Sequence, residues 1–162
     1  MSWRTGTERC CMRGNNGYMQ EYPGFPAFNQ NILSVGALKS NGALSDMNPP
    51  GGRIDVYALG EKICVPSSEN DGIMPDRGTS FSAAIVTGII LLLIQCAGTV
   101  DDDVREKYHK LEFLRRLCAS FKDNLCINQC LRHPQWFLQR LAKDKEYIRQ
   151  LVHDHYDKSV CV

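Results

Sequence analysis

An uncharged stretch, Phe81–Val100, constrains the fold of this chain more than any other feature. Its most apolar part, Ala83–Ile94, contains the run Ile-Ile-Leu-Leu-Leu-Ile. A bilayer span needs about 20 consecutive apolar residues, but this stretch includes Ser82, Thr87 and Gln95. A shorter apolar run is more typical of a buried core helix. We therefore expect a long core helix here, with a membrane span as the alternative.

The distribution of glycine divides the chain into two parts. All 13 glycines and six of the seven prolines lie in residues 1–98, whereas residues 99–162 contain no glycine. Glycine and proline mark turns, and a glycine-free segment rich in Lys, Arg, Glu and Leu is typical of helices. The sequence therefore predicts a mixed, turn-rich domain over residues 1–98 and a helical extension over residues 99–162.

Charge and composition exclude several classes of protein. The formal net charge is +1 and no run of five like charges occurs, so charge alone does not predict a nucleic-acid partner. Hydrophobic residues make up 43% of the chain, which argues against a wholly disordered protein. The first nine residues have no apolar run of the length that a secretory signal needs, and the eight cysteines show no repeated spacing. We predict no signal peptide here and assign no compartment.

Local patterns predict the elements of the first part. Residues 32–38, 53–60 and 63–65 are short apolar runs bounded by turn residues, which favours strands. Residues 67–77 are polar and are expected to form a loop. A helix is expected from about residue 80 to residue 97.

The second part carries helical signals. Thr99 precedes Asp102 at the spacing of a capping box, which predicts a helix beginning near Thr99. Apolar residues then recur every three or four positions up to Phe121, and Asp123-Asn124 interrupts the pattern. Further helices are expected over residues 125–131 and from Pro134 onward, with a break near residues 143–145.

Three short segments bear residues that chemistry could use. Gly78-Thr-Ser80 opens the apolar helix, so Ser80 lies where backbone N–H groups and the helix dipole favour developing negative charge. The ordinary alternative is that Ser80 only caps the helix. Gly14-Asn15-Asn16-Gly17 by itself indicates a turn, and Asp55–Gly60 by itself indicates a strand that runs into a turn.

Taken in order, these segments resemble the C-terminal half of the catalytic domain of the subtilisin-like serine proteases. The tract from Tyr22-Pro-Gly-Phe-Pro26 to Ile32–Ala37 is also similar to that family, and the likeness covers about residues 10–98. The resemblance implies an α/β fold, namely the C-terminal half of a doubly wound, mainly parallel sheet. The small helical extension follows it. In this family the nucleophile begins a buried helix, which favours the core helix over the membrane span.

The resemblance also implies a chemistry. Ser80 corresponds to the nucleophile, and the amide of Asn15 corresponds to the donor that binds the oxyanion. The expected function is serine endopeptidase activity, with peptide-bond hydrolysis through an acyl-enzyme on Ser80. The expected substrate is a peptide or protein, without cofactor, metal, nucleic acid or membrane. Members of this family are often secreted.

Some residues depart from the family pattern. Leu59 stands where the family usually has proline, and Ala84-Ile85 stands where many members have Pro-His. Met12-Arg13 replaces the small residues that usually precede Gly-Asn. In the family this position helps to wall the pocket for the substrate side chain, so the shape of that pocket is expected to differ.

The largest departure concerns the catalytic acid and base. Serine attack requires a base for the hydroxyl proton and an acid that orients the base, and the family order is Asp, His, Ser. No histidine precedes Ser80, and none of the aspartates before it lies in the family's acid motif. We therefore expect this chain alone to be inactive. The alternative function is that of a non-catalytic protease remnant whose helical tail binds another protein.

One cluster in the second part has ligand-type residues. Cys126, Cys130 and His133 lie close in sequence, with Cys118 nearby. Thiolate and imidazole suit zinc, but the spacing is not a common zinc pattern, and cysteines one helical turn apart are more typical of core packing. We predict no metal site here.

Overall fold

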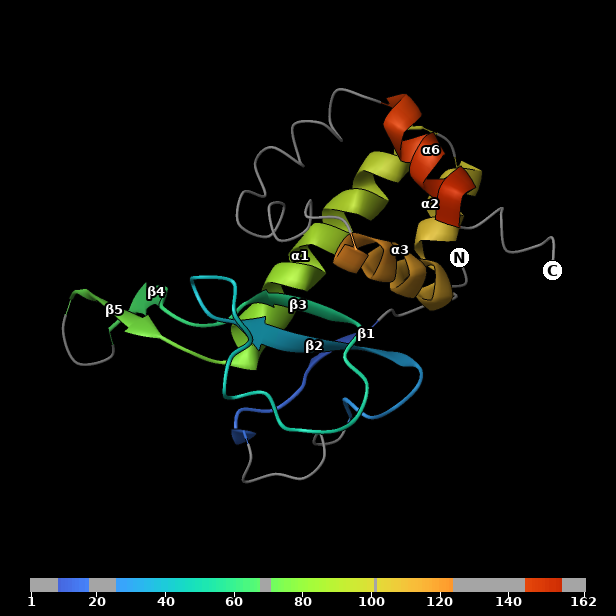
Figure 1. Ribbon diagram of the computed structural model, residues 1–162. Coiled ribbons are helices and arrows are strands. Elements are labelled where there is room, and N and C mark those ends of the chain that lie inside the picture. The colour runs from blue at the N-terminus through green and yellow to red at the C-terminus, as the bar shows by residue number, and fades with distance from the viewer. Residues whose placement is uncertain (1–8, 18–25, 68–70, 101, 124–144, 156–162) are drawn as a thin grey trace. The chain divides into compact units, whose positions relative to one another are not determined.

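A computed structural model describes residues 9–17, 26–67, 71–100, 102–123 and 145–155 (Figure 1). The described residues form two compact units. We call Cys10–Thr87 the sheet unit and the described residues from Gly88 onward the helical unit, and each is treated by itself. The boundary expected near residue 98 is a different one, namely the end of the subtilisin-like part of the sequence, and it stays a prediction.

A three-stranded sheet forms the centre of the sheet unit. Its order is β1 (Arg9–Met12), β2 (Ile32–Leu38) and β3 (Val56–Leu59). Strands β2 and β3 are parallel, with Val35 opposite Val56. Every residue of β2 is buried, as expected for a continuous apolar run covered on both faces. The mixed α/β expectation is confirmed, and the bounds of β2 are those predicted.

Strand β3 is shorter than the predicted run over residues 53–60. The residues before it are held by a polar cluster around the buried Asp55. The Asp55 carboxylate accepts the Ser34 N–H at 2.8 Å and forms an ion pair with Arg53 at 2.7 Å. Arg53 also donates to the Ile32 carbonyl at 2.9 Å. These contacts fasten the start of β3 to β2 before the regular pairing begins.

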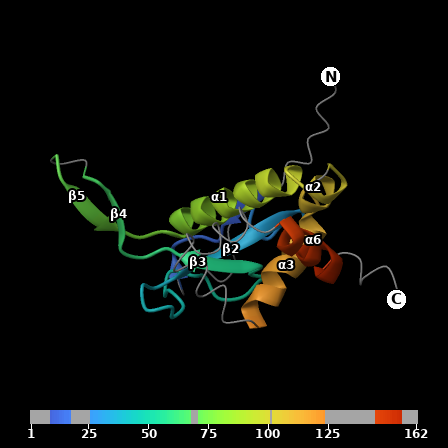
Figure 2. The same cartoon turned by 90° about the horizontal axis from the view of Figure 1, so that it is seen from above.

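A two-stranded antiparallel hairpin leaves the sheet after β3 (Figure 2). It consists of β4 (Ile63–Pro66) and β5 (Ile73–Asp76). The prediction of a loop over residues 67–77 is therefore wrong for residues 73–76, which form β5. Strand β5 is four residues long, contains Pro75 and is exposed throughout, so it shows no alternating apolar pattern. Proline is tolerated there because an edge strand need not donate from every N–H.

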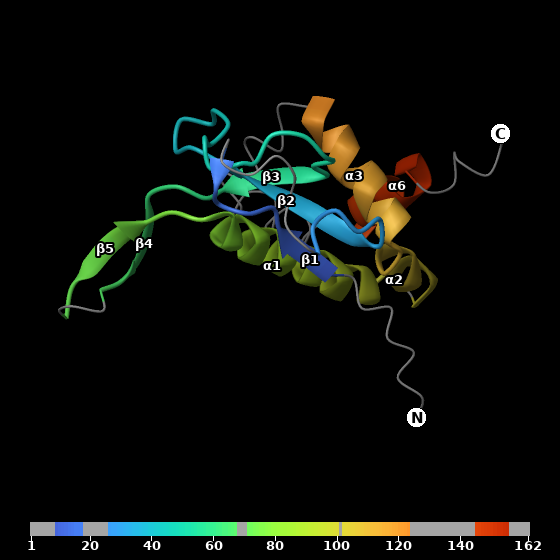
Figure 3. The same cartoon turned by 90° about the horizontal axis from the view of Figure 1, so that it is seen from below.

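Helix α1 (Thr79–Gly98) confirms the helix expected from residue 80 to residue 97. Its first turns lie against the sheet (Figure 3), where the Ser82 hydroxyl donates to the Ala58 carbonyl at 3.0 Å. Among the described helices, α1 is long and apolar enough to cross a membrane by length and composition. Its buried positions recur every three or four residues, and they are Ser82, Val86, Ile90, Leu93 and Ala97.

The helical unit contains two short helices where one was expected. Two residues separate helix α2 (Asp102–Tyr108) from helix α3 (Leu111–Asp123). Thr99 does not begin a helix, because its hydroxyl donates to the Cys96 carbonyl at 2.7 Å at the end of α1. The expected single helix from Thr99 is therefore wrong. The interruption expected at Asp123-Asn124 lies where the described residues end, and it stays a prediction.

The core of the helical unit is aromatic and aliphatic. Tyr108 packs edge-on against Phe113, with ring centroids 4.8 Å apart. The third described helix of this unit, α6 (Lys145–His155), contributes the buried Ile148. The helix expected over residues 125–131 and the start expected at Pro134 lie outside the described residues. The remaining buried apolar side chains from α2 and α3 are Val104, Leu114 and Leu117.

Candidate active site

Asn15 and Thr79 join the turn after β1 to the start of α1. The Asn15 Oδ1 atom accepts the Thr79 N–H at 2.7 Å and the Thr79 hydroxyl at 2.9 Å. The Gly14 N–H donates to the same hydroxyl oxygen at 3.2 Å. Thr79 is fully buried, and these bonds satisfy its N–H and its hydroxyl. They fix two segments that lie 64 residues apart in the sequence.

This arrangement determines which way the Asn15 amide faces. A backbone N–H can only donate, so the atom of Asn15 that meets Thr79 must be the oxygen. The Nδ2 atom, which carries two protons, is left without a hydrogen-bond partner among the described residues. The side chain therefore presents a fixed donor on the side away from Thr79.

The free donor of Asn15 and the hydroxyl of Ser80 border one small space. A Cβ placed on Gly78 would lie 2.9 Å from Ser80 Oγ and 3.4 Å from Asn15 Nδ2. Any side chain at position 78 would fill this space, so glycine keeps it open. Ser80 itself is exposed at the first turn of α1. Substrate could therefore reach the hydroxyl, the amide donor and the helix N-terminus together.

The end of β3 supports the same corner of the molecule. The Gly78 N–H donates to the Gly60 carbonyl at 2.8 Å. A Cβ on Gly60 would lie 2.5 Å from Ser82 Oγ and 2.6 Å from Ala37 Cβ, so only glycine fits. The end of β3 and the Gly60 that follows it therefore position the start of α1.

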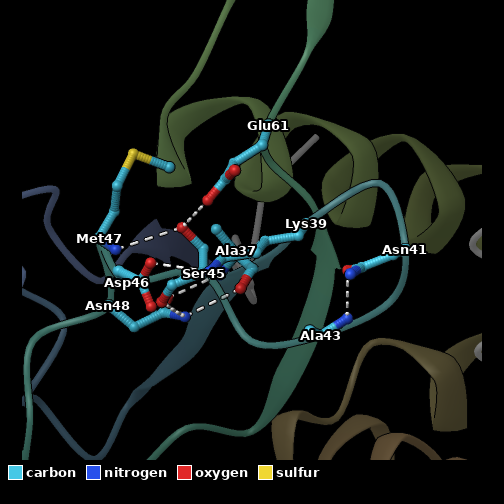
Figure 4. Close-up of polar contacts among 9 residues, drawn as sticks. All are labelled: Ala37, Lys39, Asn41, Ala43, Ser45, Asp46, Met47, Asn48 and Glu61. Atoms are coloured by element: carbon cyan, nitrogen blue, oxygen red, sulfur yellow. Dashed lines mark hydrogen bonds and ion pairs between the residues drawn. The ribbon is translucent and has the colours of Figure 1, made fainter.

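Side-chain hydrogen bonds hold the loop between β2 and β3 in place (Figure 4), and this loop contacts the turn that carries Asn15. Asn48 accepts the Ala37 N–H at 2.8 Å and donates to the Ala37 carbonyl at 2.9 Å. The Ser45 hydroxyl donates to Glu61 at 2.5 Å. From this loop, the Met47 carbonyl accepts the Gly17 N–H at 3.0 Å. Sequence reasoning missed these supporting residues, because only the folded chain brings them together.

Met12 and Arg13, which depart from the family pattern, lie in different environments. Met12 is 48% exposed, whereas Arg13 is 3% exposed and extends into the sheet unit. The Arg13 Nε and Nη2 atoms donate to the Pro49 carbonyl at 3.0 and 2.7 Å. Burial lowers the pKa of Arg13, and the neighbouring Tyr57 opposes this shift.

The described acids before Ser80 are engaged elsewhere or exposed. Asp55 pairs with Arg53, and Asp46 pairs with Lys39 at 2.7 Å. Asp76 lines an open cavity of about 280 Å³ at the base of the hairpin, together with Glu61, Lys62, Pro75 and Arg77.

The described histidines that belong to the helical unit include His109 and His153. Within the described ranges, no three His, Cys, Asp or Glu side chains form a metal-binding group. The cysteine and histidine cluster at residues 126–133 lies outside those ranges. The absence of the family's acid and base motifs before Ser80 is read from the sequence.

The comparison with known structures gives subtilisin-like proteases. The patellamide maturation protease PatG is 28% identical, with a TM-score of 0.50 over 60% of this chain and 32% of that chain. The prenylagaramide maturation protease PagA is 30% identical, with a TM-score of 0.46 over 53% of this chain and 31% of that chain. MycP1 without its N-terminal propeptide is 31% identical, with a TM-score of 0.37 over 44% and 26%. This chain thus spans about a third or less of each.

No curated protein matches the chain. The sequence profile of the Subtilase family matches residues 10–108, which is more than half of the chain. This range contains Asn15, strand β3 with the Gly60 that follows it, and the Gly78-Thr-Ser80 segment. The fold of PatG agrees with this match. The chain therefore belongs to the subtilase family.

Proposed function

We propose that this chain supplies the nucleophile and part of the oxyanion hole of a subtilisin-like serine endopeptidase. The observation that carries the proposal is the shared space beside Gly78, bordered by Ser80 Oγ at 2.9 Å and Asn15 Nδ2 at 3.4 Å. An acyl-transfer site needs this juxtaposition of a nucleophile and a donor for the developing oxyanion. The buried Thr79 contacts hold the donor in place before substrate arrives.

The reaction follows from these positions. Ser80 Oγ attacks the carbonyl carbon of a peptide bond, and the carbonyl oxygen becomes an oxyanion. The Asn15 amide and the Ser80 backbone N–H donate to that oxygen. The bond to the leaving amine then breaks, which leaves an ester between Ser80 and the acyl part of the substrate. Water hydrolyses this ester and restores the serine.

The base that takes the Ser80 proton must come from outside this stretch of sequence. No histidine precedes Ser80, and the family order places the acid and the base before the serine. The complete site thus requires an upstream segment with the family's Asp and His motifs. On this proposal the chain alone does not turn over peptides.

A fluorophosphonate probe tests the proposal, because it reacts covalently with an activated serine. The probe is applied to the 162-residue chain and to a form extended upstream through the family's Asp and His motifs. We expect labelling of the extended form only, and loss of labelling in Ser80→Ala. Ser40→Ala, a change of an exposed serine in the loop after β2, is the matched control and keeps its labelling. Labelling that survives Ser80→Ala would remove the assignment.

The second candidate function is a non-catalytic remnant whose helical tail binds another protein. The absence of any histidine before Ser80 in this sequence favours it. The coding sequence upstream of Met1 distinguishes the two candidates. An open reading frame that carries the family's Asp and His motifs supports the protease, whereas a genuine start at Met1 supports the remnant.

A further inference from the structure

Arg13 is an unusual buried cation. It is 3% exposed, and its guanidinium meets only backbone carbonyls: Nε and Nη2 donate to Pro49, and Nη2 also donates to Gly51. The Nη1 atom is buried and has no hydrogen-bond partner among the described residues. A guanidinium has five N–H donors, so part of its capacity is unused.

The charge of Arg13 also lacks an anionic partner within the described ranges. The nearby acids of the sheet unit are used elsewhere, since Asp55 pairs with Arg53 and Asp46 pairs with Lys39. A buried charge without a counter-charge is costly, and buried ions are ordinarily paired. Carbonyl dipoles compensate the guanidinium only in part. This position is therefore suited to an anion that is not part of the described chain.

A cavity adjoins Arg13 on the side of the loop between β2 and β3. Its volume is about 240 Å³, and Arg13, Asn48 and Tyr57 are among its lining residues. The Tyr57 ring packs over Gly36, where an added Cβ would lie 2.7 Å from the ring. The Tyr57 hydroxyl makes no hydrogen bond to the described residues. Burial raises the pKa of Tyr57 and the charge of Arg13 lowers it, which agrees with their closeness.

We propose that the cavity between Arg13 and Tyr57 is a binding site for a carboxylate group. The Arg13 guanidinium lines the cavity and supplies the positive charge, and the Tyr57 hydroxyl donates to the group. A buried guanidinium without a counter-charge favours an anion beside it. Asp46 also lines the cavity, but its side chain is 82% exposed and its charge is balanced by Lys39 at 2.7 Å. This site is distinct from Ser80 and does not rest on the proposed protease activity.

Two sources could supply a carboxylate, and calorimetric titration of the 162-residue chain separates them. Sodium acetate is titrated against sodium chloride at equal ionic strength, and a short peptide with a free C-terminus is titrated against its C-terminal amide. Saturable binding of acetate indicates a free small carboxylate, and binding of the peptide acid but not its amide indicates a peptide terminus. Each result supports the site. Equal binding of chloride and acetate, or of the peptide acid and its amide, would overturn it.

Two variants assign the roles of Tyr57 and Arg13. Tyr57→Phe keeps the ring over Gly36 and removes only the hydroxyl, so it preserves the fold and should weaken binding roughly tenfold. Arg13→Gln removes the charge and should weaken binding by about 100-fold or more. Arg77→Gln is the matched control, because it removes an exposed arginine of the sheet unit that does not line this cavity, and it should still bind. Unchanged affinity in both Tyr57→Phe and Arg13→Gln would contradict the proposal.

Discussion

The sheet unit and the helical unit are held together by different kinds of polar contact. In the sheet unit the side chains join distant segments, as Asn15 joins Thr79 across 64 residues and Arg13 joins Pro49 across 36. In the helical unit the ion pairs given by the structure have spacings of three or four residues, and a longer-range bond joins the exposed Lys145 Nζ to the Thr99 carbonyl at 3.0 Å. The ion pairs are Asp103–Lys107, Glu112–Arg116 and Glu146–Arg149.

The difference shows where specificity lies. Exposed pairs at helical spacing contribute a few tenths of a kcal/mol and fit almost any helix. Buried bonds between distant segments demand particular residues at both ends, because a partner left unsatisfied costs about 1–3 kcal/mol. The sheet unit thus carries the geometry of a site, whereas the helical unit shows general rules of helix packing. The following predictions test that contrast.

The largest effect is expected for Asn15→Asp in the extended, catalytically complete form. Aspartate keeps the size of the side chain and an oxygen that accepts from Thr79, but its carboxylate cannot donate to an oxyanion. We expect kcat to fall by about 10²–10³ with KM little changed, the range known for loss of such a donor in subtilisin itself. Steady-state kinetics on a peptide substrate measures this. Asn16→Asp, in the same turn, is the control and should retain activity. Equal losses in both variants would mean that only the turn was disturbed.

A core deletion in the helical unit should change stability and leave the site intact. Leu117 is buried in α3, so Leu117→Ala should lower the free energy of unfolding by about 2–5 kcal/mol. Thermal unfolding followed by circular dichroism measures it, with the exposed Arg116→Ala as control. Fluorophosphonate labelling of the folded extended form should stay unchanged. Loss of labelling in a folded Leu117→Ala protein would break the contrast between the units.

The smallest effect concerns Tyr108, whose hydroxyl is buried without a hydrogen-bond partner among the described residues. Burial raises the pKa of Tyr108, with smaller contributions from Tyr147 and Cys96. Because the folded pKa exceeds the ordinary value near 10, the folded state binds this proton more tightly than the unfolded state. Stability is then complete below about pH 10 and falls as the pH rises above it.

Tyr108→Phe tests this assignment. The ring contact with Phe113 is retained while the unsatisfied hydroxyl is removed, so stability should rise by about 1 kcal/mol at neutral pH. The loss of stability above pH 10 should become smaller. Urea unfolding at neutral and alkaline pH measures both, with Tyr57→Phe as a tyrosine control from the sheet unit. A destabilised variant with an unchanged alkaline profile would show that the hydroxyl has a partner.

The elements that the sequence predicted well carry strong local patterns. Residues 32–38 form a mainly apolar run between turn residues, and α1 is a long apolar helix with a clear start. The break between α2 and α3 was missed because the apolar period continues through Tyr108 and Leu111 without glycine or proline. There the chain turns through bonds from the His109 and Lys110 N–H groups to carbonyls three residues earlier.

The sequence named Ser80 and Asn15 as candidate site residues but not the residues that support them. Ser80 and Asn15 were predicted from short motifs in family order, because such chemistry tolerates few residue types. The role of Thr79 needed the fold, since its partner lies 64 residues away. The burial of Arg13 was not predicted from the sequence, since arginine is almost never fully buried. Only its carbonyl contacts show why it extends inward.

The central claim is that Asn15 and Ser80 act on one carbonyl group, and NMR of the Asn15 side-chain amide tests it most directly. A peptide boronate, which bonds to a nucleophilic serine and carries an anionic oxygen, is added to the extended form labelled with ¹⁵N. The account predicts that one Asn15 amide proton shifts strongly downfield on binding, and that Ser80→Ala abolishes the shift. An Asn15 signal that does not move while the boronate is bound to Ser80 would contradict the account.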